Sequence, residues 1–165
     1  MISLRRFVLS ASVALAAFTA PARPAATVVV EHYADGTVRR ESTYRGAQLD
    51  GTVRGWYENG AREYERTYRD GLQEGEHRGW HANGAPMFVY HFRRGITEGV
   101  QEQWFASGQL LTRFHHEAGH EVGQQQMWNA DGTIRSNYVI RDGKRFGLLG
   151  SMGCTGKNSS TAATP

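Results

Sequence analysis

Residues 51–71 read GTVRGWYENGAREYERTYRDG, and the pattern of this stretch returns along the chain every 24 residues. A glycine behind a short polar residue recurs at Gly36, Gly60, Gly84, Gly108 and Gly132. Further glycines with the same spacing are Gly51, Gly75, Gly99, Gly123 and Gly147, and then Gly71, Gly95, Gly119 and Gly143, with Gly46 one residue out of step. Tryptophans complete the unit at Trp56, Trp80, Trp104 and Trp128. Several residue series that share one period indicate a tandem repeat.

The first glycine series predicts hairpin tips, because Asn-Gly and Asp-Gly pairs tolerate the positive φ angles of a tight turn. The third series predicts the return turns between hairpins. The stretches between the turns have the length of strands, and residues 64–68 and 88–92 alternate with the period of two that a strand requires.

The register within a hairpin stays open on the sequence alone. A two-residue turn at residues 59–60 would place Trp56 opposite Glu63. A three-residue loop followed by a bulge would place Trp56 beside Arg62 and Tyr64 instead.

A single hairpin is marginal in water, so successive units must pair side by side before they bury enough surface. The predicted fold is therefore all-β: an elongated meander of about five 24-residue β-hairpin repeats, in a single-layer, open antiparallel sheet over residues 27–154. Aromatic side chains at equivalent positions are predicted to form its core. Residues 155–165 lack the repeat and are predicted to be a disordered tail.

Residues 1–22 predict a signal peptide, because Arg5 and Arg6 precede an apolar run over residues 7–18 and a small-x-small cleavage motif. We expect no transmembrane segment after its removal, and a periplasmic or secreted protein. Removal of Arg5 and Arg6 leaves 17 basic residues against 16 acidic ones. This near-neutral balance gives no reason to expect a nucleic-acid partner.

Two features of the sequence could carry chemistry. Cys154 is the only cysteine, so its thiol could pair with another chain, stay free, or serve redox or metal chemistry. Residues 116–120 read HEAGH and match the H-E-x-x-H zinc motif, which needs a helix to bring its two histidines together. The repeat predicts a turn at this point, so we interpret the match at His116 and His120 as coincidental and expect no metal and no cofactor.

Three segments resemble the MORN-repeat variant family, whose members are often labelled YwqK-family antitoxin components of toxin–antitoxin systems. The segments are GWYENG at 55–60, YRDG at 68–71 and GEHRGW at 75–80, and the resemblance extends over about residues 28–147. It implies β-hairpin repeats and a binding or scaffold role, with no catalytic residues to carry over. An antitoxin-like function is an alternative that the resemblance also implies.

No arrangement of residues predicts an enzyme. We expect an exported, non-catalytic module for protein–protein interaction or scaffolding in the bacterial cell envelope, with a protein partner. The candidate binding residues are aromatic and lie close to the predicted tips: Trp56, Tyr57, Trp80, Trp104, Phe105 and Trp128. They form either part of the core or a surface stripe, and such a stripe could also stack on cell-wall glycans.

Overall fold

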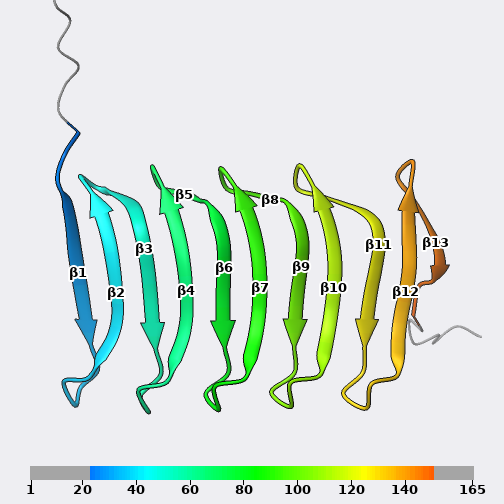
Figure 1. The fold of residues 1–165 in the computed structure, drawn as a ribbon, viewed down its shortest axis with the longest axis horizontal. Helices are drawn as coiled ribbons and strands as arrows, with labels where there is room; N and C mark the ends of the chain where they lie inside the picture. Colours follow the sequence, from blue (N-terminus) through cyan, green and yellow to red (C-terminus); the bar gives the residue numbers. More distant parts are fainter. Residues whose placement is uncertain (1–22, 151–165) are drawn as a thin grey trace, which may run out of the picture.

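The computed structural model describes residues 23–150, which form one antiparallel sheet of thirteen strands without any helix (Figure 1). The strands are β1 (Ala26–His32), β2 (Val38–Arg45), β3 (Gln48–Trp56), β4 (Arg62–Arg69), β5 (Leu72–Gln73), β6 (Gly75–Trp80), β7 (Pro86–Arg93), β8 (Ile96–Thr97), β9 (Gly99–Trp104), β10 (Leu110–Glu117), β11 (His120–Trp128), β12 (Ile134–Arg141) and β13 (Lys144–Leu148). Successive long strands are neighbours in the sheet, while the short β5 and β8 pair only with β4 and β7. The predicted all-β open meander is confirmed.

Each hairpin tip closes with a three-residue loop and a bulge. At the second tip, the Gly60 N–H donates to the carbonyl oxygen of Tyr57 and the Tyr57 N–H donates to that of Ala61, both at 2.9 Å. Gly60 takes a φ of 80°, which favours glycine. Trp56 pairs with Arg62 across the bulge, so the second of the two possible registers is the correct one.

The last four return turns follow another rule, in which both central residues have positive φ angles. Asp70 has a φ of 49° and Gly71 a φ of 81°, which is the geometry of a two-residue type I′ turn. In the first return turn, Gly46 takes the first central position with a φ of 61°, and Ala47 takes the second. Gly46 is out of step in the sequence because this turn requires its glycine one position earlier.

The return turns also dock on the preceding repeat. The N–H groups of Gly71, Gly95 and Gly119 donate to the carbonyl oxygens of Leu49, Gln73 and Thr97 at 2.8, 2.7 and 3.0 Å. The carboxylates of Glu74 and Glu98 accept the backbone N–H of Arg94 and Ala118, at 2.8 and 3.1 Å. Val122 occupies the next equivalent position, so the last return turn has no carboxylate of this kind.

The first four glycines of the second series each mark a bulge in the strand that leaves a return turn, whereas Gly147 pairs regularly with Tyr138. Between β10 and β11, for example, the pairing shifts between Phe114 and His116, opposite Gly123. Two residues beyond each of the first four glycines, one side chain is almost fully buried. These side chains are Val53, His77, Gln101 and Gln125, with exposed fractions of 2%, 1%, 6% and 0%. The most buried positions are therefore mainly polar, which differs from the predicted aromatic core, because a single layer encloses side chains fully only where its strands bend.

His77 shows how such a site is satisfied. Its ring lies 5.6 Å from the ring of Tyr68 and 4.7 Å from that of Phe92, and its Nε2 lies 2.8 Å from the Thr67 carbonyl oxygen, to which it donates. Burial lowers the pKa of His77 below its ordinary value of 6.5. The neutral imidazole is therefore the form that the folded protein holds.

We expect the protein to lose stability as the pH falls below about 6.5, because the unfolded chain then binds a proton at His77 that the folded chain binds only at lower pH. Glutamine stands at the two equivalent positions that follow, Gln101 and Gln125. His77→Gln should therefore preserve the fold and make the free energy of unfolding depend less on pH. Urea unfolding of both proteins between pH 5 and 8 measures the effect. Equal slopes would show that His77 is not the titrating group.

The sheet presents two different faces, which we define by residues that pair directly across strands. The aromatic face carries Tyr64, Arg66, Tyr68, Phe88, Tyr90, Phe92, Phe114 and Tyr138. The charged face carries a cross-strand row of Glu41, Arg54, Glu65, Arg78, Val89, Glu102 and Arg113. The charges of this row alternate in sign: Arg54 lies 3.2 Å from Glu41 and 2.9 Å from Glu65, and beyond Val89 the Arg113 guanidinium lies 2.7 Å from Glu102.

Three predictions fall outside the described residues: the signal at 1–22, the thiol of Cys154 and the tail at 155–165. Between residues 23 and 150, no helix has the length and apolar character needed to cross a membrane.

Candidate functional site

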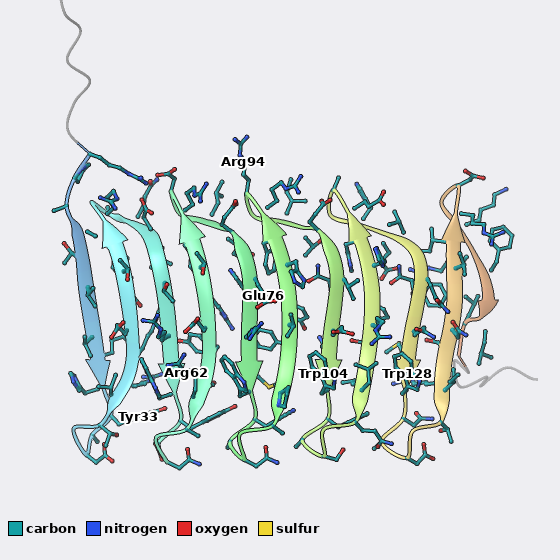
Figure 2. The ribbon with its side chains drawn as sticks, viewed as in Figure 1. Tyr33, Arg62, Glu76, Arg94, Trp104 and Trp128 are labelled. Carbon is teal, nitrogen blue, oxygen red and sulfur yellow. The ribbon has the colours of Figure 1, made fainter. Side chains whose placement is uncertain are left out.

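The four tryptophans lie at the ends of β3, β6, β9 and β11, immediately before the hairpin tips. Trp104 and Trp128 lie close to this end of the sheet in Figure 2, far from Arg94 at a return turn. All four side chains are half-buried, as are Tyr57 and Phe105. The guanidinium of Arg62 lies over the Trp56 ring, 5.9 Å from its centre, and covers part of it. The structure thus places the predicted aromatic residues in one row, and their binding role stays a prediction.

The row also holds adjacent repeats together through the backbone. The hydroxyl of Tyr33 donates to the carbonyl oxygen of Trp56 at 2.6 Å, and that of Tyr57 donates to the carbonyl oxygen of Trp80 at 2.8 Å. Burial raises the pKa of the Tyr57 hydroxyl, which keeps the donor protonated. In the third repeat, His81 Nε2 lies 2.9 Å from the carbonyl oxygen of Trp104 and takes the same role. Sequence reasoning missed this function of Tyr57.

Phe105 stands at the next equivalent position and has no donor for the Trp128 carbonyl. We expect Phe105→Tyr to add a hydrogen bond and raise the free energy of unfolding by about 1 kcal/mol, and Tyr57→Phe to lower it by a similar amount. Chemical denaturation of the two variants and the parent measures both changes. The two substitutions must change the free energy of unfolding in opposite directions. A Phe105→Tyr protein less stable than the parent would contradict the role of this position as a hydrogen-bond donor to the next repeat.

The H-E-x-x-H match lies in a hairpin. Glu117 pairs with His120 across a return turn whose central residues, Ala118 and Gly119, have φ angles of 47° and 83°. His116 pairs with Glu121, and burial lowers the pKa of its imidazole. A turn cannot present the motif as a zinc-binding helix does. No group of three metal-binding side chains occurs in the part of the chain that the structure describes.

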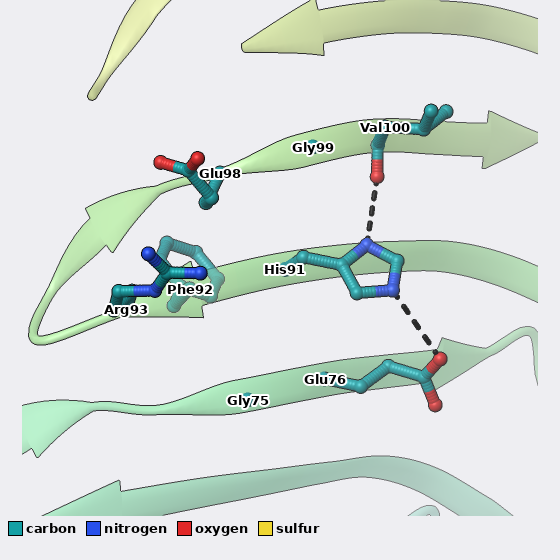
Figure 3. Close-up of a pocket in the computed structure, with 8 residues that line it drawn as sticks. All are labelled: Gly75, Glu76, His91, Phe92, Arg93, Glu98, Gly99 and Val100. Atoms are coloured by element: carbon teal, nitrogen blue, oxygen red, sulfur yellow. Dashed lines mark hydrogen bonds and ion pairs between the residues drawn. The ribbon is translucent and has the colours of Figure 1, made fainter. Parts of the chain in front are cut away.

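An open hollow of about 490 Å³ lies where β6, β7 and β9 bend together (Figure 3). His91 lies at its centre: Nδ1 donates to the Val100 carbonyl oxygen at 2.8 Å, and Nε2 lies 3.5 Å from a carboxylate oxygen of Glu76. Glu98 lines the same hollow and is engaged by the Ala118 N–H. The imidazole of His91 and the carboxylates of Glu76 and Glu98 are thus all engaged with other groups of the fold. The open hollow could receive a side chain of a partner, but its polar groups are not free to carry a reaction. Sequence reasoning missed it, because Glu76 and His91 meet only through strand pairing.

The first strand forms an apolar edge that the sequence analysis did not select. Every residue of β1 is exposed, and Val28, Val29 and Val30 have exposed fractions of 54%, 44% and 43%. β1 pairs with β2 on one side only, so the backbone groups along its other side have no strand partner. Its signal in the sequence is the run Thr-Val-Val-Val at 27–30. The run marks a strand but does not say that the strand lies at an edge.

The opposite edge is protected. β13 is five residues long and begins with Lys144 and Arg145, and Gly147 interrupts its regular backbone with a φ of 119°. Phe146 and Leu148 are 54% and 55% exposed there. Short length, basic side chains and backbone irregularity are devices by which natural sheets prevent edge-to-edge pairing. β1 is seven residues long, carries no lysine or arginine, and pairs regularly with β2 from Ala26 to Glu31.

Comparison with known families finds a match to the family described as MORN repeat variant, over residues 49–70. This segment is therefore similar to a MORN-type repeat. It contains all of β3 except Gln48, the second hairpin tip and the whole of β4. No curated protein matches the chain.

The tip geometry of the matched segment recurs along the chain with the 24-residue period. The tip of the matched repeat has direct counterparts at Gly36, Gly84, Gly108 and Gly132, which have φ angles of 87°, 82°, 86° and 83°. MORN-type repeats are generally non-catalytic modules and suggest interaction with a protein or a membrane. Their known chemistry adds no catalytic residue to the surfaces described above.

Proposed function

We propose that this chain is a non-catalytic interaction module that binds a protein partner by strand addition at the β1 edge. The observation that carries the proposal is an exposed seven-residue edge strand with three adjacent valines, whose backbone has no strand partner on its outer side. An extended segment placed beside such an edge gains main-chain hydrogen bonds, while alternate side chains supply specificity. The MORN-type repeat supports the same class of function.

The contrast between the two edges supports the proposal further. A long apolar edge favours pairing with other chains, and natural proteins normally block it. This chain blocks β13 with Lys144 and Arg145 but leaves Val28, Val29 and Val30 open. A sheet that protects one edge strand and leaves the other open is expected when the open edge is a binding site.

Lysine at Val29 tests the proposal, because a charged side chain on the edge should prevent strand addition while leaving the half-exposed site in the monomer intact. The protein carries a C-terminal affinity tag and is recovered from cells that also produce it without the tag. Proteins that copurify, including untagged copies of the chain itself, are compared between the parent and Val29→Lys. The matched control is Leu148→Lys at the protected edge. Loss of partners in Val29→Lys alone is expected, and an unchanged set would overturn the proposal.

We also propose that the module works outside the cytoplasm, on the basis of the signal pattern at residues 1–22. Fractionation of cells and N-terminal sequencing of the recovered protein test this point. A mature N-terminus between residues 20 and 26 is expected. An uncleaved chain confined to the cytoplasm would overturn it.

A further inference from the structure

The sequence of β1 is compatible with pairing to itself. A two-fold axis through Val29 places two antiparallel copies of β1 in full register, so that all seven residues of each strand find a partner. Val29 then lies opposite Val29 of the second copy, and Val28 lies opposite Val30. Glu31 faces Thr27, and Ala26 faces His32. No two like charges are directly opposed, and the six valines form apolar pairs on both faces: Val28 and Val30 of both copies on one face, and the two Val29 side chains on the other.

The topology favours this arrangement over end-to-end stacking. Along the path from β1 to β13 the strands alternate in direction, and both end strands point the same way in Figure 1. A second copy added by simple translation would therefore place β13 parallel to β1. Every strand pair within the described sheet is antiparallel, and parallel pairing is slightly less stable per residue. The two-fold arrangement continues the antiparallel pattern without a change.

The protection of β13 makes the assembly finite. Pairing between two β13 strands would join only five residues of each copy, and Gly147, with a φ of 119°, interrupts their regular backbone. The short length, this irregularity and the basic side chains of Lys144 and Arg145 all disfavour such an interface. Pairing through β1 therefore stops at two copies instead of continuing into a filament.

We propose that the partner at the β1 edge is a second copy of this chain, joined through antiparallel β1 strands about a two-fold axis at Val29. This inference rests on the proposed function of the β1 edge. It makes one continuous sheet from two chains, with the aromatic faces of both copies on the same side, since a two-fold axis perpendicular to a sheet preserves its faces. The dimer would present two equivalent sets of hollows and tips in one elongated surface.

The mass of the purified protein, in the form that cells produce, tests the proposal. Sedimentation of the parent over a concentration series should give two chain masses, and Val29→Lys, which opposes two ammonium groups across the axis, should give one. Leu148→Lys should remain a dimer. Circular dichroism shows whether each variant keeps its β spectrum. A parent that is monomeric throughout, or a dimer that persists in Val29→Lys, would overturn the inference.

Disulfide trapping fixes the register. In a Cys154→Ser background, Val29→Cys places two thiols directly opposite each other, at a Cα separation that a disulfide can span. Val28→Cys is the control, because Val28 faces Val30 and the two copies of Val28 lie too far apart. Rapid covalent dimer from Val29→Cys alone is expected, and equal trapping of both variants would refute the axis. If the purified parent is monomeric while Val29→Lys still abolishes capture of another protein, this inference fails and the proposed function stands.

Discussion

Gly79→Gln should lower the free energy of unfolding by about 2–3 kcal/mol, because no space exists for a side chain beneath Phe88. A Cβ atom at Gly79 would lie 2.1 Å from Cε1 of Phe88, which pairs with it directly across β6 and β7. The ring covers the glycine and cannot move aside without losing its stacking on Tyr90, whose ring centre lies 4.8 Å away. Equilibrium denaturation measures the loss.

In the later repeats, the large and the small residue of this cross-strand pair exchange strands. At the positions equivalent to Gly79 and Phe88, Gln103 pairs with Thr112 and Met127 pairs with Ser136. A large residue on one strand thus meets a small one on the next. Phe88→Thr should therefore restore most of the stability that Gly79→Gln removes. In a double-mutant cycle, simple additivity of the two single changes would refute this size complementarity.

Gln125→Leu should cost about 2–3 kcal/mol, although leucine has a similar volume and strands accept it readily. The Gln125 amide is fully buried at the β11 bulge. Its Oε1 accepts the His115 N–H at 3.2 Å, and its Nε2 donates to the carbonyl oxygens of His115 at 2.9 Å and Val122 at 2.7 Å. The side chain replaces the ladder bonds that the bulge removes. Leucine would leave three part-buried backbone groups without these partners, each at a cost.

Gln124→Leu is the matched control for this variant. Gln124 is exposed, and its amide donates to Asn137 at the surface at 3.0 Å. We expect a change within about 0.5 kcal/mol there. Equal losses at positions 124 and 125 in thermal or chemical unfolding would show that the buried amide has no special role.

The fold was accessible from the sequence because backbone geometry depends on glycine at its turns. Gly60 and Gly71 marked a tip and a return turn, and the repeat multiplied that information along the chain. The bulged register at Trp56 could not be chosen, since both alternatives use the same Asn-Gly pair. Gln125 gave no signal of burial, because a glutamine in a strand looks like a solvent-facing residue until the bulge beside it is known.

The candidate sites were less accessible for a related reason. The tryptophans were found because they repeat, yet the residues that distinguish one repeat from another, such as Glu76 and His91, are brought together only by strand pairing. The valines at 28–30 read as an ordinary strand, and only the completed sheet shows that nothing lies beside them. Whether a strand lies at the centre or at the edge of a sheet depends on the whole fold and cannot be told from the sequence of that strand alone.

The unequal docking of the return turns implies an order of unfolding. Glu74 and Glu98 fasten the turns at Arg94 and Ala118, but Val122 offers nothing to the turn at Asp142, and every residue of β13 is exposed. In a linear array, each unit is stabilised mainly by its neighbours, so a weak terminal junction opens by itself. The protein should therefore unzip from its carboxyl end, with the amides of β12 and β13 exchanging with deuterated solvent well before those of β6 and β7.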